Sequence, residues 1–166
     1  MKKLLVVALM LVGVTQLQAQ TKFGAQVNFT TSSVAGLGFG AHAEIFVNDK
    51  LSIQPAFDYY LSKDVAGIAG LTVSNSNWAI NADAHYYFMD EPMIYGIGGL
   101  SFFNTKVSIP SINTGFGIIP AQDVSSSTFG VNIGAGAVFG PVFVEAKYNS
   151  PLAGLVLTAG FKFGGK

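Results

Sequence analysis

The feature that most constrains this fold is a two-residue alternation of side chains that recurs along the chain. In residues 77–88, Trp78 and Ile80 alternate with Asn77 and Asn81. Alternation with this period is typical of a strand whose two faces meet different environments. The segments expected to form strands are 22–31, 36–47, 51–61, 77–88, 93–103, 128–139, 142–149 and 154–163.

The connections between these segments alternate in length. Residues 48–50, 89–92 and 140–141 make tight connections, whereas residues 62–76 and 104–127 make much longer ones. Strands of about 9–11 residues, with short turns at one end and longer loops at the other, are typical of transmembrane β-barrels. We therefore predict an all-β fold, an eight-stranded antiparallel up-and-down transmembrane β-barrel. The faces of 93–103 are the least clear, because glycines interrupt the alternation.

Aromatic residues fall on the predicted outward face and gather near the strand ends. Such a placement is expected where a barrel meets the two interfaces of a bilayer. The predicted aromatic girdle consists of Phe29, Tyr59, Trp78, Tyr86, Phe88, Tyr95, Phe129, Phe139, Tyr148, Phe161 and Phe163. Phe23 and Phe103 are expected to extend these two bands.

Composition agrees with a membrane location and excludes several functions. Charged residues make up 11% of the chain, well below the roughly 25% of an ordinary soluble domain. The formal net charge is zero, and all nine basic residues are lysines. This balance argues against nucleic-acid binding, which needs a clustered basic surface. Because the chain has no cysteine, disulfides, cysteine metal sites and a lipoprotein anchor are excluded.

The first residues predict export. A basic start at Lys2 and Lys3 precedes the apolar run 4–14, and the small residue Ala19 precedes Gln20. This order is typical of a secretory signal peptide. The alternative, an uncleaved anchor, is disfavoured because a spanning helix needs about 20 apolar residues. We expect a signal peptide at 1–19 and an outer-membrane β-barrel domain at 20–166.

The inward faces of the predicted strands carry charged side chains. The predicted lumen charge network consists of Lys22, Glu44, Asp58, Asp83, His85, Glu145, Lys147 and Lys162, with His42 on the same face. A barrel of eight strands encloses just enough space for side chains to fill. Buried charges must be paired, so a packed, salt-bridged lumen is expected. A narrow path for protons or ions is the alternative.

The chain resembles the small outer-membrane β-barrel family that includes the OmpA transmembrane domain and the OmpX-type proteins. The resemblance covers residues 21–163 and rests on the leader, the alternation, Tyr95-Gly96-Ile97-Gly98-Gly99-Leu100 and an aromatic-ending last strand. It implies an outer-membrane location, with membrane lipid, lipopolysaccharide and the barrel-assembly machinery as partners. Family members often end on an aromatic residue that this machinery reads, whereas Gly164-Gly165-Lys166 follow Phe163 here. Either Phe161 and Phe163 still supply the signal, or assembly is less efficient.

No catalytic, cofactor-binding or metal site is expected. His42 and His85 lie on different strands, without a His-x-His pair or a recognisable Ser/His/acid arrangement. The predicted function is structural, a barrel that displays surface loops for adhesion or interaction, or that supports envelope integrity. A narrow ion or small-solute channel, a lipid-modifying enzyme and a soluble lipocalin-like barrel are the alternatives.

The two long loops, 62–76 and 104–127, contain more apolar residues than exposed loops usually do. One explanation is that the strands continue above the membrane and the loops pack on one another. The other is that the loops form a docking surface for a partner.

Overall fold

The fold was analysed in a computed structural model that describes residues 21–61, 65–66, 72–90, 93–109, 111–113, 118–120 and 122–164. Within these ranges the strands are β1 (Thr21–Thr30), β2 (Leu37–Asn48), β3 (Leu51–Tyr60), β4 (Val65–Ala66), β5 (Thr72–Asp90), β6 (Met93–Ile109), β7 (Ile112–Asn113), β8 (Ile118–Ile119), β9 (Gln122–Phe139), β10 (Val142–Asn149) and β11 (Gly154–Phe163). None of the described residues forms a helix long and apolar enough to cross a membrane.

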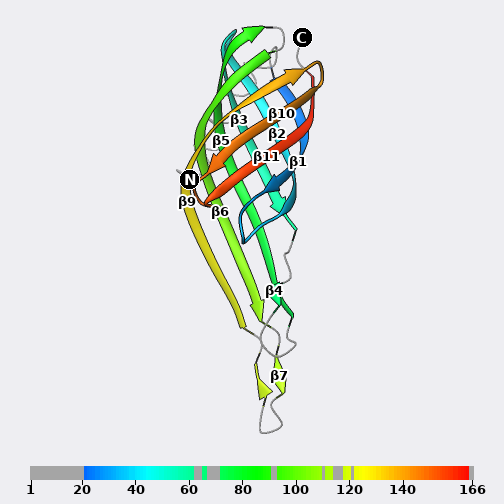
Figure 1. Ribbon diagram of the computed structural model, residues 1–166, viewed down its shortest axis with the longest axis vertical. Coiled ribbons are helices and arrows are strands. Elements are labelled where there is room, and N and C mark those ends of the chain that lie inside the picture. Colours follow the sequence, from blue (N-terminus) through cyan, green and yellow to red (C-terminus); the bar gives the residue numbers. More distant parts are fainter. Residues whose placement is uncertain are drawn as a thin grey trace, which may run out of the picture.

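The eight long strands close into a barrel (Figure 1). They follow the order β3-β2-β1-β11-β10-β9-β6-β5, and a further pairing of β3 with β5 joins the two ends of the sheet. All of these pairings are antiparallel. The predicted eight-stranded antiparallel up-and-down barrel is therefore confirmed. Short β4 pairs with β5, and β7 pairs with β8.

Strand lengths differ from the prediction in one part of the chain. β10 and β11 have the predicted bounds, whereas β5 begins at Thr72, β6 continues to Ile109 and β9 begins at Gln122. Residues 72–76, 104–109 and 122–127, which were assigned to loops, are therefore strand. Their backbone groups pair with one another in the same register as the wall, and this pairing does not require one apolar face.

The wall is apolar outside and polar inside. On neighbouring strands β1 and β11, Phe29 is opposite Leu157 and both are about half exposed, whereas Asn28 is opposite Thr158 and both are buried. A water-soluble barrel with an apolar ligand cavity would show the reverse. The lipocalin-like alternative is therefore wrong for this chain.

The two ends of the barrel are unlike. We call the end with the tight turns at residues 49–50 and 140–141 the turn end, and the opposite end the loop end. Gly140 has φ of +63° in its turn, a conformation that glycine adopts without steric cost. β5, β6 and β9 continue beyond the other strands at the loop end (Figure 1).

Candidate functional site: a closed polar lumen and an exposed strand extension

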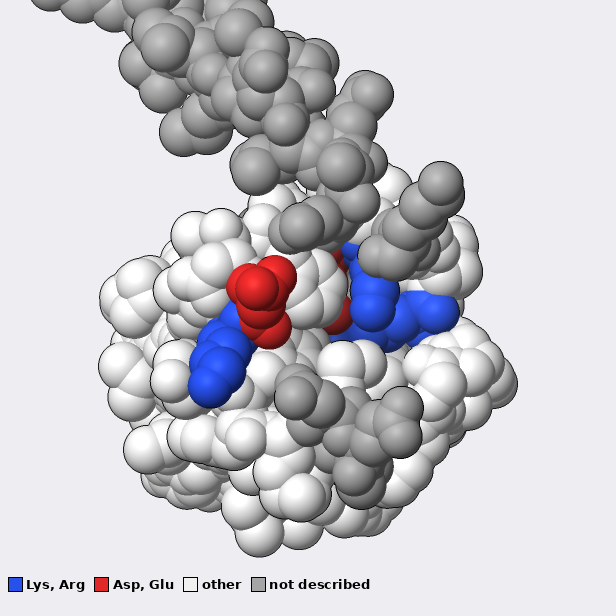
Figure 2. Space-filling view, turned by 90° about the horizontal axis from the view of Figure 1, so that it is seen from above, with Lys and Arg blue, Asp and Glu red and all other residues white. Residues whose placement is uncertain are grey.

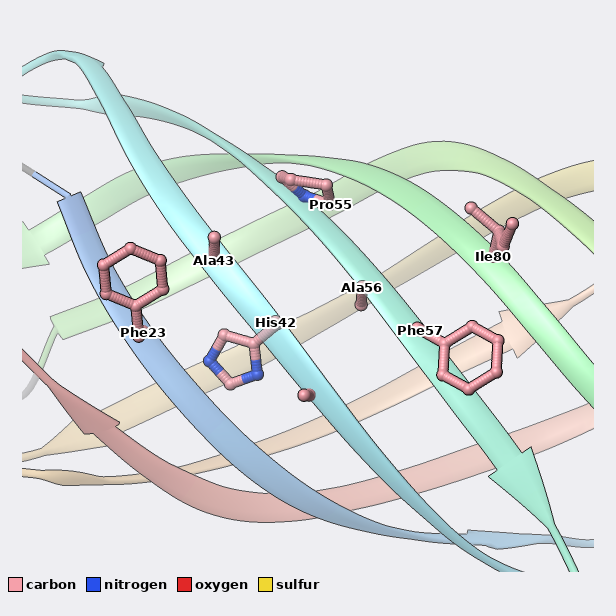
Figure 3. A pocket seen from close by; sticks show the side chains of 8 residues that line it. Phe23, His42, Ala43, Pro55, Ala56, Phe57 and Ile80 are labelled. Atoms are coloured by element: carbon pink, nitrogen blue, oxygen red, sulfur yellow. The ribbon is translucent and has the colours of Figure 1, made fainter. Parts of the chain in front are cut away.

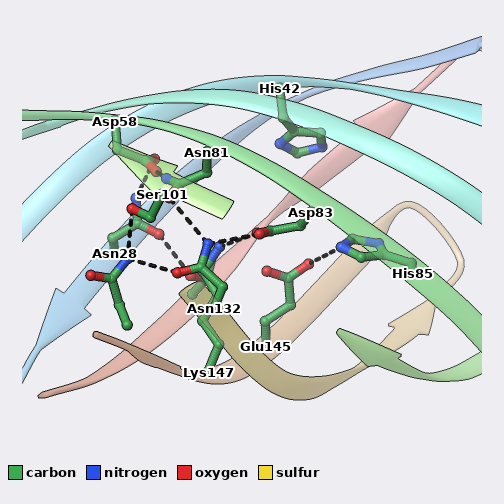
Figure 4. A network of polar contacts seen from close by, with 12 residues as sticks. Asn28, His42, Asp58, Asn81, Asp83, His85, Ser101, Asn132, Glu145 and Lys147 are labelled. Carbon is green, nitrogen blue, oxygen red and sulfur yellow. Dashed lines mark hydrogen bonds and ion pairs between the residues drawn. The ribbon is translucent and has the colours of Figure 1, made fainter. Parts of the chain in front are cut away.

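The barrel lumen is filled by polar side chains that are almost inaccessible to solvent. Seven of the eight residues of the predicted charge network are buried inside it, namely Glu44, Asp58, Asp83, His85, Glu145, Lys147 and Lys162. They form two groups. One lies around Glu44 and Glu145 near the turn end. The other lies around Asp58 and Asp83 in the middle of the barrel (Figure 4).

Glu44 on β2 is held by side chains from three other strands. Its carboxylate accepts hydrogen bonds from Ser52 Oγ (2.6 Å to Oε1), Tyr87 Oη and Lys162 Nζ (3.0 Å to Oε2). His85 Nδ1 lies 3.4 Å from Oε1. Charge-assisted bonds of this kind are about twice as strong as neutral ones, so Glu44 ties β2, β3, β5 and β11 together.

Glu145 on β10 lies on the other side of His85. Its Oε1 accepts a hydrogen bond of 2.8 Å from Tyr95 Oη and lies 3.9 Å from His85 Nε2. The His85 ring stacks on the Tyr95 ring at a centroid distance of 4.6 Å. The imidazole is therefore enclosed between two carboxylates and an aromatic face.

The position of Tyr95 corrects the sequence prediction. Tyr95 and Phe103 were assigned to the outward aromatic bands, but their exposed fractions are 0% and 4%. In β6 the inward residues are the odd-numbered ones, because Tyr95 is opposite the inward Tyr87 and Phe103 opposite the inward Ala79. The glycines of this strand left the sequence without a clear apolar face.

Asp58 accepts its described hydrogen bonds from amides and not from lysines. It accepts hydrogen bonds from Gln26 Nε2 (2.7 Å), Asn28 Nδ2 (2.6 Å) and Asn81 Nδ2 (2.7 Å). Asn28 Oδ1 accepts in turn from Thr158 Oγ1 (2.7 Å). These neutral partners come from β1, β5 and β11, and the charge prediction had omitted them. Their inward position in the two-residue alternation could have identified them as lumen residues.

Asp83 forms the second mid-barrel centre. Lys147 Nζ donates to its Oδ2 at 2.7 Å and Asn132 Nδ2 to its Oδ1 at 2.7 Å. Asn149 Nδ2 donates to Asn132 Oδ1 (2.8 Å) and to Ser101 Oγ (2.9 Å). Because these five residues come from β5, β6, β9 and β10, the network cross-links the half of the barrel that Glu44 reaches least.

Two apolar clusters lie at the ends of this polar filling. Toward the turn end, Tyr87, Tyr95, Ile97, Val138 and Phe143 pack together, with Phe46 and Met93 against them. Toward the loop end the cluster consists of Ala35, Tyr60, Ala79, Phe103, Leu152 and Val156. In this second cluster Ala35 and Leu152 come from the short connections after β1 and β10, which fold inward over the lumen.

Two inward residues lie apart from the ion pairs. Lys22 is half buried at the rim, with Nζ 5.2 Å from the centre of the Phe46 ring. His42 is buried, and its Nδ1 lies 2.8 Å from Gln26 Oε1. Figure 2 views the barrel from the turn end and shows acidic and basic side chains near the centre of this face, whereas the other described residues in view are uncharged.

The remaining girdle residues are on the outer wall. Trp78 stacks against Phe57 at a centroid distance of 6.2 Å and packs against Phe102 at 5.6 Å with the two rings tilted. The half-exposed or exposed members are Phe29, Tyr59, Tyr86, Phe88, Phe129, Phe139, Tyr148, Phe161 and Phe163. With Tyr95 and Phe103 removed, the predicted bands retain these residues, Trp78 and Phe23.

At the loop end, parts of three strands continue beyond the other strands within the same sheet. We call residues 72–76, 104–109 and 122–127 the extension. β9 pairs with β6 from Gln122 onward, but with β10 only from Asn132 onward. Every residue from Gln122 to Phe129 is exposed. In the described part of the chain, one edge of β9 is therefore unpaired along most of the extension.

An ion pair on the extension connects β6 to β9. Lys106 Nζ lies 2.8 Å from Asp123 Oδ2, and both side chains are at least half exposed. Hydrogen bonds from Lys106 and Ser108 hold the pKa of the Asp123 carboxyl below its ordinary value. Asn104 Nδ2 also reaches across, to Ser127 Oγ at 2.8 Å.

A family model of the outer membrane protein beta-barrel domain matches residues 4–163. The chain belongs to this family. The resemblance predicted from the sequence is thus confirmed, and the protein is located in the outer membrane. No curated protein sequence matches the chain.

Solved structures of outer-membrane proteins are similar to this chain. A major outer membrane protein from Thermus thermophilus has a TM-score of 0.53 and 13% identity, over 86% of this chain and 99% of that one. The N-terminal β-barrel domain of Pseudomonas aeruginosa OprF has 0.48 and 18%, over 88% and 98%. Ail from Yersinia pestis, solved in complex with the heparin analogue sucrose octasulfate, has 0.48 and 18%, over 86% and 96%. At these identities the likeness concerns the fold.

Proposed function

We propose that this outer-membrane barrel is a structural scaffold without enzymatic chemistry, which presents the extension outside the cell as a binding surface. The loop end faces outward and the turn end faces the periplasm, as short turns and longer loops are oriented in known barrels. A signal peptide at 1–19, which lies outside the described residues, delivers the chain.

The lumen geometry supports the absence of enzymatic chemistry. Nucleophilic catalysis requires a base that accepts the proton of the nucleophile. Ser52 donates to Glu44, whereas His85 lies between two carboxylates and contacts no hydroxyl nucleophile in the described contacts. All of these side chains are buried. The same packing, with an apolar cluster at each end, favours a closed scaffold over a conducting channel.

The unpaired edge of β9 is the observation that carries the binding role. Val131 N donates to Ser150 Oγ and Val131 O accepts from Ser150 N, so the backbone groups of Val131 point away from β6. In an antiparallel ladder alternate residues point the same way. Asp123, Ser125, Ser127 and Phe129 therefore direct their N–H and C=O groups to the free edge. An edge of this kind can accept an extended segment of another chain.

Proline substitution tests this role. Ser127→Pro removes one outward N–H and leaves the bonds to β6 intact, because the neighbouring even-numbered residues make those bonds. Ser127→Ala is the matched control, since it loses the same hydroxyl but keeps the N–H. An array of random extended peptides, probed with purified barrel, should give signals that Ser127→Ala retains and Ser127→Pro loses. Equal binding by both variants would contradict recognition through this edge.

Membrane partners follow from the outer wall. We assign the apolar belt and its aromatic bands to contact with outer-membrane lipid, including lipopolysaccharide around the loop end. The barrel-assembly machinery is proposed to read the last strand, where Phe161 and Phe163 are exposed on the outer wall. The loops 62–76 and 104–127 remain the proposed partner site, and the extension is the part of them that the structure describes as strand. Most of their apolar side chains lie outside the described residues.

A further inference from the structure

The buried acids of the lumen outnumber its buried lysines. In the described part of the chain, the buried charged side chains of the lumen are four carboxylates and two lysines, namely Glu44, Asp58, Asp83, Glu145, Lys147 and Lys162. Lys147 pairs with Asp83 and Lys162 with Glu44, whereas Asp58 accepts hydrogen bonds from neutral amides. No lysine among the described residues forms an ion pair with Glu145. Because an uncompensated buried charge is costly, Glu145 needs another source of positive charge.

His85 is placed to supply this charge. Its Nδ1 lies 3.4 Å from Glu44 Oε1, and its Nε2 lies 3.9 Å from Glu145 Oε1 (Figure 4). All three side chains are buried. A neutral imidazole carries a proton on one nitrogen, whereas an imidazolium has an N–H on both. Only the imidazolium can therefore present an N–H to both carboxylates, and with Lys162 at Glu44 the two acids then meet two cations.

This bridge joins strands that are not neighbours in the wall. Glu44 is on β2, His85 on β5 and Glu145 on β10, and no two of these strands pair with each other. A neutral His85 would direct the lone pair of one nitrogen at a carboxylate. The other charged or titratable groups around the bridge are Lys22 on β1, His42 on β2, Asp83 and Tyr87 on β5, Tyr95 on β6, Lys147 on β10 and Lys162 on β11.

The second histidine of the lumen has different contacts. His42 Nδ1 lies 2.8 Å from Gln26 Oε1, which is a neutral acceptor. The His42 ring lies over Gly24 of β1, where a Cβ would come within 2.3 Å of Nε2 (Figure 3). The ion pairs between a histidine and an acid in the described residues all belong to His85. His42 is therefore a matched comparison, a buried imidazole in the same lumen without a pair of carboxylates.

We propose that His85 is a proton-binding site that holds three strands together at the turn end of the barrel. The doubly protonated ring bridges Glu44 and Glu145, and loss of one proton releases Glu145 on β10 from the bridge. While both acids are ionised, the bridge is complete at low pH. Its contribution to stability is lost as the pH rises through the titration of His85 in the folded barrel. This role is independent of the extension, so either proposal can fail alone.

Nuclear magnetic resonance of the histidine rings tests the proton directly. The chain has two histidines, so purified barrel with isotope-labelled histidine gives two sets of ring signals, which His42→Gln assigns. We expect His85 to carry a proton on both nitrogens at neutral pH and to lose one as the solution becomes alkaline. A His85 ring that is singly protonated at neutral pH would overturn the proposal and leave the proton on an acid instead.

Unfolding measures what the proton does. In lipid vesicles, the unfolding equilibrium constant of the unchanged protein should rise about tenfold as His85 loses its proton, as expected for a charge beside an opposite charge. His85→Gln cannot gain a proton and should show no rise over the same pH range. His42→Gln is the matched control and should keep the rise. An equal rise in His85→Gln would assign the pH dependence to other groups and overturn the role of His85.

Glu145→Gln tests the bridge when His85→Gln does not fold. It removes one of the two carboxylates but keeps a side chain of the same size, so the His85 ring should lose its proton at a lower pH than in the unchanged protein. The ring signals of His85 measure this shift, and heat-modifiable gel migration verifies that the barrel is folded. An unchanged titration of His85 in Glu145→Gln would overturn the bridge to β10.

Discussion

The strands β5, β6 and β9 pass through two regions that differ in almost everything except their backbone pairing. In the wall, one face is buried and polar, as at Asn81 and Asp83, and the other is apolar. In the extension, Gln122–Ser127 are exposed on both faces. The register continues from one region into the other without a shift between β6 and β9. Backbone hydrogen bonds thus hold the sheet together in both regions. Polar and apolar side chains alternate only where the two faces of the sheet meet different environments.

Among the described residues, the wall and the extension each contain a close Lys–Asp pair, so the two pairs can be compared in distance and in exposure to solvent. Lys147–Asp83 measures 2.7 Å with side chains 3% and 1% exposed, whereas Lys106–Asp123 measures 2.8 Å with side chains 50% and 58% exposed. The distances are nearly equal, so differences between the pairs must come from solvation.

The largest effect is expected for Lys147→Met. This change leaves Asp83 buried without its cation and should destabilise the barrel by about 3–5 kcal/mol. Denaturant unfolding in lipid vesicles measures it. Adding Asp83→Asn should restore most of the loss, because no uncompensated charge remains. Lys106→Met should not change unfolding measurably, and an equal loss there would remove the distinction between the two pairs.

Charge on the lipid face should act nearly as strongly. Ala135 is exposed on β9 near the middle of the wall, and Ala135→Arg should destabilise the barrel by about 2–4 kcal/mol. In the extension, Ser126→Arg on the same strand should be tolerated. Heat-modifiable gel migration and unfolding curves compare the two. Tolerance of Ala135→Arg would contradict the assigned faces of β9.

Tyr95→Phe tests whether Tyr95 on β6 points into the lumen. It removes the hydroxyl that donates to Glu145 and should cost about 1.5–3 kcal/mol, as expected for a hydrogen bond to a charged group. Tyr86→Phe, on the outer wall, is the control and should have little effect. A larger loss of stability for Tyr86→Phe than for Tyr95→Phe would contradict the inward position of Tyr95 and favour its place in the outer girdle.

The smallest effect concerns the pH dependence of the extension. The pKa of Asp123 is lowered in the folded state, so its ion pair contributes fully above the ordinary Asp pKa of about 3.9. The contribution is lost as the pH falls through the lower, folded value. The amide resonance of Val124 should shift over this acidic range, and Lys106→Met should move the transition toward the ordinary value. An identical titration in both proteins would exclude the pairing in solution.

Much of the fold follows from local pattern. Period-two alternation identified every long strand, and the tight turns at residues 49–50 and 140–141 set their antiparallel order. β10 and β11 were predicted to the residue because their alternation and their flanking turns agree. The failures have a common cause. In β6, glycines make the two faces of the strand equally apolar, so the sequence does not show which face is inward. In the extension, both faces meet water, so polar and apolar residues do not need to alternate.

The sequence by itself determined which residues point inward on most strands, and therefore which charges the lumen holds. Only the tertiary structure decided which of them meet, because inward residues become neighbours through the closure of the sheet and the tilt of its strands. Lys147 and Asp83 are far apart in the chain, and Asp58 is bound by amides although lysines were available in the sequence. Alternation fixes the direction of a side chain, whereas its partner depends on the register of the whole barrel.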